Sequence, residues 1–469
     1  MKKLTKIVAT IGPATESEPV IEQLMLAGMD VARFNTKHGT PEWHRERIRR
    51  VRNIAQRLQQ PIAVLLDLQG PEIRIWLPAD KGFSLAAGEE LLLSADQRQV
   101  SGKTVFVPQQ VVETLKPNST VLLDDGACEF TVVGKEAQQL RVRAHNQCEV
   151  KPHKSLNTPG VSIDMPSLIA ADLVQLDGAV ESAVDYVGLS YVRDKKDIEI
   201  LRGELDKRGL KSGIVAKIEN QAALDNIDEI IRESDAVMVA RGDLAVEVPF
   251  EQLAFWQKLI IAKCRLLAKP VITATQMLKS MVEEPRPTRA EVSDVANAVY
   301  DSTSAVMLSE ETTIGKYPVK AVETQAKIAA FNEPYVESYL EDWLDDNNPS
   351  GVTNAAMYLI QHRAEAIDSI ICLTEIGTTA GLLSRFRPKV PIHALTSNEQ
   401  TYRKLALYFG VMPHIMEFPV GGVQEPEVIA QKLRELNIVE PGKTVLIIYG
   451  SIWKTPGLTN SLSLIRVPK

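Results

Sequence analysis

The alternation of short apolar runs with longer helical stretches constrains the fold more than any other feature of the sequence. The runs are nearly continuous in apolar and β-branched residues, which is typical of parallel strands buried on both faces. Eight such runs occur, at residues 5–10, 30–34, 62–67, 186–189, 213–218, 237–240, 271–275 and 305–308. Eight parallel strand–helix units predict an α/β fold of the (β/α)8 TIM barrel type, and an open doubly wound sheet is the alternative.

Two segments interrupt this alternation and indicate further domains. Residues 71–163 contain short alternating segments between Gly, Asn, Asp and Pro turns, which predicts a small inserted β-domain that is suited to act as a lid. Its strands are expected at residues 91–94, 104–107, 120–123, 129–133 and 140–144. Residues 341–349 are acidic and lack periodicity, as expected of a linker. We therefore expect the first part of the barrel at 1–70, the β lid domain at 71–163, the second part of the barrel at 164–345, and a C-terminal α/β domain, a candidate for regulation, at 346–469. In the C-terminal domain, strands are expected at residues 369–373, 392–395, 445–449 and 462–467.

Composition argues against several classes of partner. A net charge of −7, with 24% charged and 45% hydrophobic residues, gives no reason to expect nucleic acid or a membrane. The start of the chain lacks the apolar region of a signal peptide, and nowhere do 18 apolar residues follow one another. The cysteines are scattered without metal-binding spacing, so we interpret them as packing thiols of a cytoplasmic protein. They are Cys128, Cys148, Cys264 and Cys372.

The stretch Ile214-Val-Ala-Lys-Ile-Glu-Asn220 carries the first chemical signal. On a strand, Lys217 and Glu219 point to the same side because side chains alternate with a period of two. The next predicted strand is followed by Asp243, which delivers a second carboxylate at the same end of the sheet. Adjacent carboxylates repel unless a cation lies between them, so either Lys217 neutralises both or a divalent metal does. The alternative is a structural cluster of ion pairs.

The other predicted strands also end in polar residues, as expected where the carboxyl ends of barrel strands carry the chemistry. These ends are Thr10-Ile-Gly-Pro13, Arg33-Phe-Asn-Thr-Lys-His38, Asp67-Leu-Gln-Gly-Pro-Glu-Ile-Arg74, Thr273-Ala-Thr-Gln-Met277 and Leu308-Ser309.

Together these stretches resemble the pyruvate kinase family. The match runs from Lys6-Ile-Val-Ala-Thr-Ile-Gly-Pro13 through Pro285-Arg-Pro-Thr-Arg-Ala-Glu291 to Gly315-Lys-Tyr-Pro318, and the inserted and C-terminal domains fall where that family has them. Several long motifs in the same order are far more specific than a lone glycine pattern. The resemblance implies transfer of a phosphoryl group from phosphoenolpyruvate to ADP in glycolysis, giving pyruvate and ATP. It also implies Mg²⁺ or Mn²⁺ as cofactor and a homotetramer.

The resemblance assigns roles to the central residues. Lys217 would lie against the transferring phosphate and the developing negative charge, and Glu219 and Asp243 would offer hard oxygens to the divalent ion. The substrate carboxylate would be held by the backbone of Ala240, Arg241, Gly242 and Asp243.

Two hydroxyl side chains are assigned to substrate binding and proton transfer. The hydroxyl of Thr275 would bind the substrate, and Thr275 with a water chain to Ser309 would protonate the enolate. Because a hydroxyl is a weak acid, water is the expected immediate donor. The alternative for Thr275 is a hydroxyl that only caps its strand.

The loops after the second and third strands would bind phosphate and nucleotide. Arg33, counted among the catalytic residues, and Arg74 would clamp phosphate, for which the planar guanidinium is well suited. Asn35 and His38 would follow on the nucleotide side. The alternatives are surface ion pairs for the arginines and a structural hydrogen bond for His38. Glu247 is interpreted as a supporting or structural residue.

The sequence departs from the family at the expected potassium site, which normally uses an Asn, a Ser, an Asp and a Thr carbonyl. Asn35 and Asp67 remain, but Lys37 replaces the Ser and Leu68 replaces the Thr. We hypothesise that the Lys37 ammonium fills the monovalent site, donating to Asp67 and Glu72, so that potassium is not needed. The alternative is that Lys37 points to solvent.

Other departures surround the site and the expected effector region. Gln69 replaces a Lys, and Ala245 and Glu310 each replace a Gly, which is expected to alter rate or nucleotide affinity. Residues 374–379 follow a predicted strand and precede a helix, where an effector phosphate can bind with help from the loop 450–457. Glu375 opposes an anion there, so an unregulated enzyme is the alternative. The effector candidates are Thr374, Gly377, Thr378 and Thr379.

Two interpretations compete with an active phosphotransferase. One is a catalytically impaired regulator that binds nucleotide or sugar phosphate, favoured by the departures but not by the intact central residues. The other is a barrel enzyme that makes or breaks carbon–carbon bonds through a metal enolate. That reading leaves Arg33, Arg74 and the lid without a role.

Overall fold

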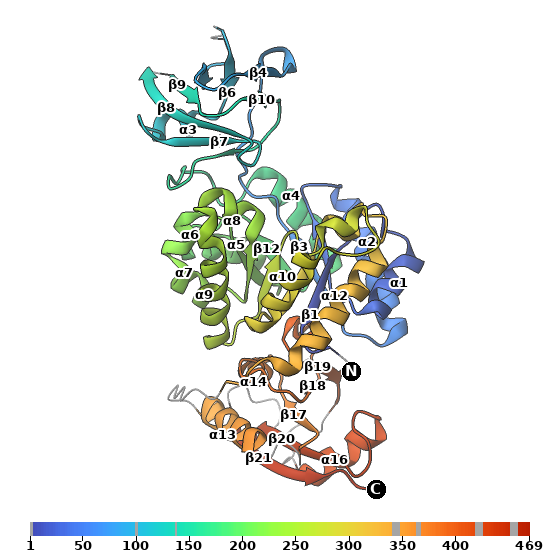
Figure 1. The fold of residues 1–469 in the computed structure, drawn as a ribbon. Helices are drawn as coiled ribbons and strands as arrows, with labels where there is room; N and C mark the ends of the chain where they lie inside the picture. The colour runs from blue at the N-terminus through green and yellow to red at the C-terminus, as the bar shows by residue number, and fades with distance from the viewer. Residues whose placement is uncertain are drawn as a thin grey trace.

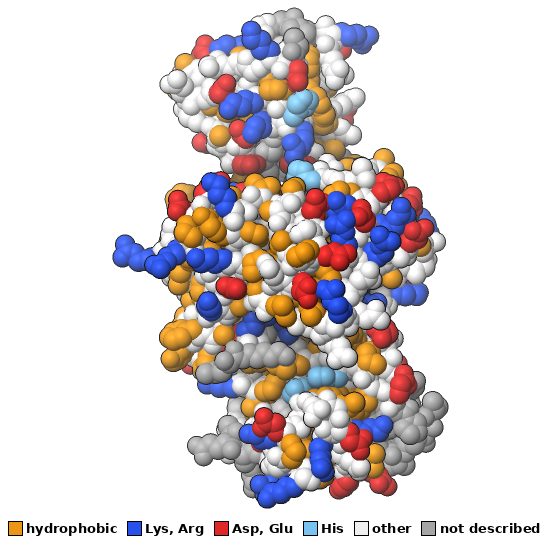
Figure 2. Space-filling view, turned by 90° about the vertical axis from the view of Figure 1, so that its right-hand side faces the viewer, with side chains coloured by type: hydrophobic (Ala, Val, Ile, Leu, Met, Phe, Trp, Pro, Cys, Tyr) orange, Lys and Arg blue, Asp and Glu red, His pale blue; other side chains and the backbone are white. Residues whose placement is uncertain are grey.

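The computed structural model describes residues 3–98, 102–136, 138–339, 348–362, 367–417, 425–450 and 458–469. The chain forms three parts that follow one another along the long axis of the molecule (Figure 1). The β-domain lies at one end, the barrel in the middle and the C-terminal domain at the other end. Hydrophobic side chains interrupt the charged surface on the barrel face that Figure 2 shows.

The central sheet is a closed barrel of eight parallel strands, so the TIM barrel is confirmed and the open sheet is wrong. Around the barrel the strands follow the order β1, β2, β3, β12, β13, β14, β15 and β16, with β16 returning to β1. They are β1 (Lys6–Thr10), β2 (Val31–Asn35), β3 (Ala63–Asp67), β12 (Tyr186–Leu189), β13 (Gly213–Ile218), β14 (Ala236–Ala240), β15 (Val271–Ala274) and β16 (Ala305–Leu308). All eight predicted runs are therefore barrel strands.

Helices cover the outside of the barrel, and the apolar sides of these helices pack against the outward side chains of the strands. In α9 (Leu253–Leu266), apolar residues at spacings of three and four predict a buried face of Leu253, Trp256, Ile260, Cys264 and Leu267. Ile260 and Cys264 are buried and Leu253 and Trp256 are partly buried, but Leu267 lies just past the helix and is 38% exposed. The barrel helices are α1 (Glu18–Ala27), α2 (Pro41–Leu58), α4 (Ala170–Ala179), α5 (Lys195–Lys207), α6 (Gln221–Asp225), α7 (Ile227–Glu233), α8 (Arg241–Glu247), α9 (Leu253–Leu266), α10 (Arg289–Tyr300), α11 (Glu310–Thr313) and α12 (Pro318–Asn332).

The inserted β-domain, called the lid below, has a six-stranded and a two-stranded sheet around its own apolar core. Five strands match predicted segments: β5 (Glu90–Ser94), β6 (Thr104–Phe106), β7 (Thr120–Leu123), β8 (Cys128–Glu136) and β9 (Gln139–Ala144). The sequence did not predict β4 (Phe83–Leu85), β10 (Cys148–Val150), β11 (Leu156–Asn157) or helix α3 (Gln109–Thr114). These strands are too short to show a period of two.

The C-terminal domain is a five-stranded sheet in the order β19, β18, β17, β20 and β21. Strands β17 (Ser369–Leu373), β18 (Ile392–Thr396), β20 (Thr444–Gly450) and β21 (Thr459–Arg466) were predicted, whereas β19 (Val411–Ile415) was not, because Pro413 argues against a strand. Its place at the sheet edge is where proline is tolerated. The helices are α13 (Asn348–His362), α14 (Thr378–Ser384), α15 (Glu399–Lys404) and α16 (Pro426–Glu435).

Two further expectations concern cysteines and membranes. All four cysteines are free, and all but Cys148 are buried, in agreement with packing thiols. None of the described helices combines the length and the apolar character that a membrane crossing requires. The predicted linker lies outside the described residues up to residue 347.

A buried histidine in α2 makes the fold sensitive to acid. His44 is 3% exposed and meets Phe34 and Trp43 edge-on, at ring-centroid distances of 6.0 and 5.1 Å. Burial disfavours the charged ring and lowers the pKa of His44 to about 4. The folded protein therefore binds this proton more weakly than the unfolded chain, whose histidine pKa is about 6.5.

We predict that the free energy of unfolding has the full contribution of His44 above pH 6.5. This contribution is lost as the pH drops toward 4, which lowers the free energy of unfolding by up to about 3 kcal/mol. Urea midpoints at pH 7.5 and 5 check this. The variant His44→Phe should lose less stability between the two pH values than the wild type, whereas the exposed-site control His145→Phe should behave like the wild type. Equal pH dependence of His44→Phe and wild type would contradict the prediction.

Candidate functional site

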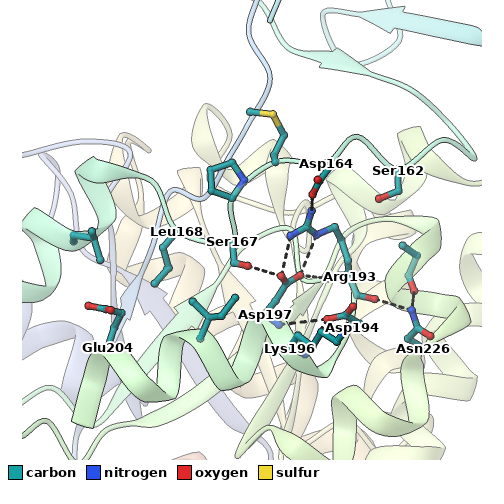
Figure 3. Close-up of a pocket in the computed structure, with 15 residues that line it drawn as sticks. Ser162, Asp164, Ser167, Leu168, Arg193, Asp194, Lys196, Asp197, Glu204 and Asn226 are labelled. Carbon is teal, nitrogen blue, oxygen red and sulfur yellow. Dashed lines mark hydrogen bonds and ion pairs between the residues drawn. The ribbon is translucent and has the colours of Figure 1, made fainter. Parts of the chain in front are cut away.

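One pocket of the barrel rim lies beside the segment that leads from the lid back into the barrel (Figure 3). Arg193 lies 2.9 Å from the carboxylate of Asp197 and 3.6 Å from that of Asp164. The hydroxyl of Ser167 also donates to Asp197. None of the predicted site residues lines this pocket, and its Arg193 pairs with two of the carboxylates that line it, so we interpret it as part of the lid attachment.

Lys217 occupies the centre of the predicted site. It extends from β13, is 8% exposed, and lies 2.9 Å from Glu219 and 3.4 Å from Asp67, while its ammonium donates to the Ser190 hydroxyl at 2.7 Å. The alternation of side chains along β13 thus brings Lys217 and Glu219 together as predicted. Asp67 joins them from β3. The absence of a side chain at Gly188 on β12 makes space for the Asp67 carboxylate, because a Cβ at that position would lie 2.8 Å from it.

The charges in this cluster support one another. Burial disfavours the ammonium of Lys217, but Asp67, Glu219 and Asp243 outweigh this effect and raise the pKa of Lys217. Burial likewise opposes ionisation of Asp67, yet Lys217 and Arg33 together hold the pKa of its carboxyl below the usual value. Lys217 therefore carries its positive charge at the bottom of the site.

Arg33 is fixed next to this cluster at the end of β2. Its guanidinium donates to the Asp67 carboxylate from Nε at 2.8 Å and lies 2.6 Å from the same oxygen through Nη2, while Nη1 donates to the Thr10 hydroxyl at 2.9 Å. Arg33 is only 8% exposed, so its contact with Asp67 is not a surface ion pair. A buried guanidinium held in this way is oriented before any ligand arrives.

Glu219 and Asp243 form the second half of the site. Glu219 is 2% exposed and accepts a hydrogen bond from the Tyr191 backbone at 2.6 Å. Tyr191 has a left-handed backbone, with φ of 56°, which turns its N–H toward this carboxylate. Burial and the negative charge of Glu219 raise the pKa of Asp243 to about 6. A carboxylate whose charge is disfavoured by a neighbouring carboxylate fits a site for a divalent cation.

The number of protein ligands limits which cation fits. Among the described residues, no group of three or more His, Cys, Asp and Glu side chains is arranged to hold a metal ion. A cation at Glu219 and Asp243 would therefore take further ligands from water or substrate. Mg²⁺ is usually held in this way, by one or two carboxylates plus substrate phosphate.

Thr275 caps β15 and faces the start of α8. Its hydroxyl donates to the Ala274 carbonyl at 2.7 Å and accepts from the Gly242 backbone at 2.8 Å. Thr275 and Gln276 both have left-handed backbones, with φ of 69° and 53°, a strained arrangement that is common at functional sites. The capping role is therefore present, and it also places the hydroxyl beside the predicted carboxylate site.

The side chain of Arg241 stabilises this corner. It donates to the carbonyls of Ala274 at 3.0 Å and Thr275 at 2.6 Å and pairs with Asp294 at 2.7 Å. The side chain of Arg241 is thus engaged within the protein, and the role of its backbone in holding a substrate carboxylate stays a prediction. Ala240 ends β14 and is buried.

The remaining predicted residues lie at the rim. Ser309 precedes α11, and its backbone N–H donates to Glu311 at 2.8 Å. His38 is exposed, and its backbone N–H donates to the Asn35 carbonyl at 3.2 Å. Arg74 is also exposed and donates to the carboxylate of Glu72 at 3.0 Å. The assigned roles of these residues in substrate and proton handling stay predictions.

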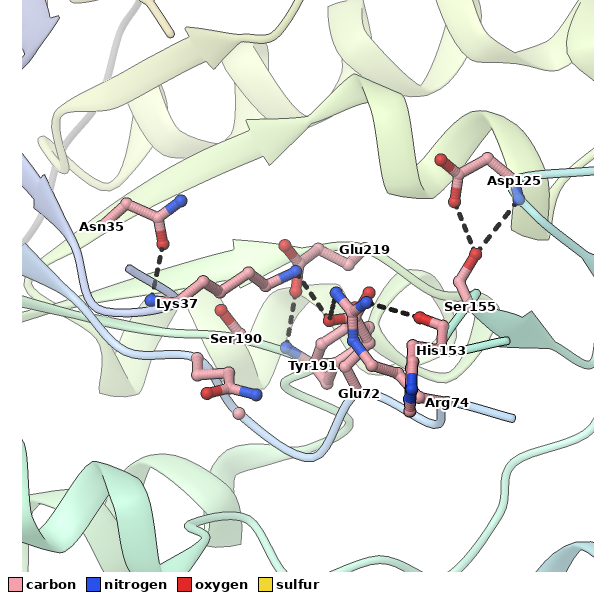
Figure 4. A network of polar contacts seen from close by, with 12 residues as sticks. Asn35, Lys37, Glu72, Arg74, Asp125, His153, Ser155, Ser190, Tyr191 and Glu219 are labelled. Carbon is pink, nitrogen blue, oxygen red and sulfur yellow. Dashed lines mark hydrogen bonds and ion pairs between the residues drawn. The ribbon is translucent and has the colours of Figure 1, made fainter. Parts of the chain in front are cut away.

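Lys37 contacts Glu72 at 3.0 Å (Figure 4) and thus does not point freely into solvent. The predicted second contact, to Asp67, is wrong, because Arg33 and Lys217 already neutralise that carboxylate. Burial disfavours the charge of Glu72, but Lys37 and then Arg74 outweigh it and lower the pKa of its carboxyl.

The other candidate oxygens for a monovalent ion already accept hydrogen bonds. The side-chain oxygen of Asn35 accepts from the Lys37 backbone at 3.2 Å, and the Leu68 carbonyl accepts from the Ser190 hydroxyl at 2.8 Å. Ser190 thus connects Leu68 with Lys217. A potassium ion would have to displace or share these donors.

The remaining departures from the family leave the centre of the site intact. Glu310 pairs with Lys279 on the surface, and both side chains are about half exposed. Gln69 donates from its backbone to Asp172 at 3.0 Å. Ala245 lies within α8. None of these residues contacts Lys217.

The predicted effector region has the expected position between β17 and α14. The hydroxyl of Thr374 accepts from the Gly377 backbone at 3.0 Å, and Gly377 has a φ of 90°. Thr379 shares a hydrogen bond with Thr459 at 2.8 Å, and Glu375 accepts from Ser397. Residues 451–457 of the predicted partner loop lie outside the described residues. Binding of an effector by Thr374, Gly377, Thr378 and Thr379 stays a prediction.

Sequence reasoning missed Ser190, Tyr191 and Thr10 as site residues. Ser190 and Tyr191 directly follow β12, the one barrel strand whose end was not considered. The rule that barrel chemistry gathers at strand ends was thus a sufficient signal for them. Thr10 ends β1 and was noted only as part of a motif.

Comparisons with known proteins decide the family. Residues 2–322 match the model "Pyruvate kinase, barrel domain" and residues 351–465 match "Pyruvate kinase, alpha/beta domain". The chain belongs to the pyruvate kinase family. It is 40% identical to a pyruvate kinase of Bacillus licheniformis over 98% of this chain and 80% of the relative. It is 38% identical to that of Clostridium acetobutylicum, covering 98% of both chains, and 37% identical to that of Dictyostelium discoideum, covering 99% and 94%.

Family membership confirms the resemblance seen in the sequence. It also disfavours the unrelated barrel enzyme that would make or break carbon–carbon bonds. The family models cover strand β13 with Lys217, helix α8 with Asp243 and the effector region, so the geometry described above belongs to the part of the chain that defines the family.

Proposed function

We propose that this protein transfers the phosphoryl group of phosphoenolpyruvate to ADP, giving pyruvate and ATP, as a glycolytic enzyme of the cytoplasm. The observation that carries the proposal is the charged Lys217, held by Asp67 and Glu219 beside the second carboxylate, Asp243. The free cysteines agree with a reducing compartment.

The chain's own residues account for the main demands of the reaction. Lys217 and Arg33 present two fixed cations to the phosphate and to the charge that develops as the enol oxygen leaves, and such preorganised groups are worth about 3–4 kcal/mol each. Glu219 and Asp243 would hold Mg²⁺ or Mn²⁺, which supplies further charge neutralisation of phosphate and carboxylate. The backbone of Gly242 and Asp243 would hold the substrate carboxylate, for which the Gly242 N–H would have to give up its hydrogen bond to Thr275.

The last step requires a proton at the enolate carbon. Thr275 is held by Gly242 and Ala274 at the edge of the site, so its hydroxyl is oriented but is also a weak acid. We therefore assign proton delivery to water ordered by Thr275 and Ser309. Arg74 would clamp phosphate together with Arg33, and Asn35 and His38 would bind on the nucleotide side.

Replacing Lys217 by Met should lower kcat at least about 100-fold, because it removes one preorganised cation from the transition state. A coupled assay for pyruvate and ATP formation measures this, with circular dichroism to check folding. Lys279→Met, at the exposed partner of Glu310, is the matched control and should retain activity. Wild-type protein without activity at saturating Mg²⁺, phosphoenolpyruvate and ADP would refute the proposed function and favour a regulator.

We further propose that Lys37 replaces a monovalent cation. Its ammonium is tied to Glu72 at 3.0 Å, and three nearby oxygens, on Asn35, Leu68 and Asp67, already accept from protein donors. We infer that this ammonium supplies the positive charge that a monovalent ion would otherwise supply, and few ligands remain for such an ion.

The wild-type enzyme should accordingly work equally well in sodium and in potassium buffer. The variant Lys37→Ser removes the ammonium and should become several-fold more active on addition of potassium. Initial rates in tetramethylammonium, sodium and potassium chloride of equal ionic strength measure this, with Lys279→Met as the control for loss of a lysine charge. A many-fold activation of the wild type by potassium would contradict the proposal.

Exposed aromatic side chains support a homotetramer. They lie on and beside barrel helices and include Phe250 at 85%, Phe331 at 69%, Tyr335 at 66% and Phe255 at 60% exposure. Large apolar groups exposed together commonly mark protein interfaces. Sedimentation should give the mass of four chains, and charged substitutions such as Phe331→Glu should lower it. A monomer at micromolar concentration would contradict this.

A further inference from the structure

The chain segments that enter and leave the lid are each tied to an element of the site. On the entry side, Glu72 pairs with Lys37 from the loop after β2. On the return side, Asn157 at the end of β11 donates from its amide to the Glu247 carboxylate at 3.2 Å. Glu247 is the last residue of α8, the helix that carries Asp243. The return contact therefore joins the lid to the carboxylate pair.

Glu247 and Asp243 are four residues apart in α8 and thus lie on the same side of the helix. Burial raises the pKa of Glu247, while the hydrogen bonds from Asn157 and from the Thr158 backbone oppose that rise. A partly buried carboxylate needs such donors, because leaving it unpaired is costly. Loss of the lid contact therefore changes the environment of α8 directly.

The segment that follows β11 has little freedom to absorb a movement of the lid. The backbone N–H of Val161 donates to the Thr158 carbonyl at 2.9 Å, and the Thr158 hydroxyl donates back to the Val161 carbonyl at 2.9 Å. Gly160 completes this turn with a φ of 74°. Beyond it, Arg193 holds Asp164 (Figure 3). The turn at residues 158–161 therefore follows directly on the contact between Asn157 and Glu247.

We propose that Glu247 is a positioning residue that couples the pose of the lid to the cation-binding carboxylate Asp243 through helix α8. The inference rests on the proposed function, in which Asp243 holds the divalent cation. Coupling between two binding events is reciprocal. Cation binding should therefore favour the lid pose in which Asn157 meets Glu247, and that contact should in turn strengthen cation binding.

The test uses the full-length protein with Mn²⁺ as the probe and the variants Asn157→Ala, Glu247→Ala and their combination. Calorimetric or spin-resonance titration gives the Mn²⁺ dissociation constant. Each single variant should weaken Mn²⁺ binding by about 5-fold or more, the lower end of common coupling between sites. The double variant should bind no more weakly than Glu247→Ala alone, because one contact is removed in each case.

Asn146→Ala is the matched control. Asn146 is an exposed lid asparagine that donates to the Ala127 carbonyl at 2.8 Å within the lid, so this variant should bind Mn²⁺ like the wild type. Hydrogen–deuterium exchange supplies a second readout that does not depend on activity. Mn²⁺ should slow exchange at residues 156–163 in the wild type and in Asn146→Ala, but not in Asn157→Ala.

Unchanged Mn²⁺ affinity in Asn157→Ala and Glu247→Ala, or additive losses in the double variant, would overturn the coupling and leave the proposed activity intact. A wild-type protein that binds no Mn²⁺ would instead overturn the metal site and the inference together. Circular dichroism identifies a variant that fails to fold. If Glu247→Ala fails, Asn157→Ala decides the matter through both affinity and exchange.

Discussion

The burial of one ammonium group dominates the physical organisation of the site. Lys217 is nearly inaccessible, and an isolated charge in such a place is strongly disfavoured. The barrel compensates for this cost by placing two carboxylates beside the ammonium, Asp67 at the end of β3 and Glu219 directly after β13. Removing one partner of a buried pair costs about 3–5 kcal/mol, so the network fixes its members in place.

The same network has a net charge that suits its proposed task. Arg33 and Lys217 carry two positive charges, and Asp67, Glu219 and Asp243 carry three negative ones when ionised. The sum is one net negative charge. We assign it to Asp243, because burial and the charge of Glu219 raise the pKa of this carboxyl. A divalent cation would reverse the sign of the cluster, and a phosphorylated carboxylic acid is then a complementary ligand.

Much of the fold follows from local pattern, and the exceptions have physical causes. Parallel barrel strands are buried on both faces, so their apolar runs stand out in the sequence, and all eight were predicted. Strands β4, β10 and β11 have three residues or fewer and owe their existence to pairing partners far along the chain. Leu267 was assigned to the core by helical spacing, but the helix ends one residue earlier and turns it outward.

The site shows the same division between local and non-local information. The proximity of Lys217 and Glu219 follows from the period of a strand, whereas the partner of Lys37 does not. From the sequence, both Asp67 and Glu72 were possible partners of the Lys37 ammonium. The choice of Glu72 follows from competition, because Arg33 and Lys217 reach Asp67 first across the barrel. Which of several carboxylates a lysine meets is decided by the other cations around it, and these are known only once the strands are in register.

The distribution of charges in the site also bears on how a separately folded lid can be coupled to Lys217 and the carboxylates around it. The lid has its own apolar core, so nothing in its interior requires a particular pose over the barrel. Polar contacts tie its two connecting segments to the barrel, Glu72 with Lys37 and Asn157 with Glu247. Each of these contacts ends on a loop or helix that also carries a site residue. A ligand that draws on the charges of the site therefore alters the electrostatic surroundings of both connections, and the lid can respond without any apolar surface being exposed.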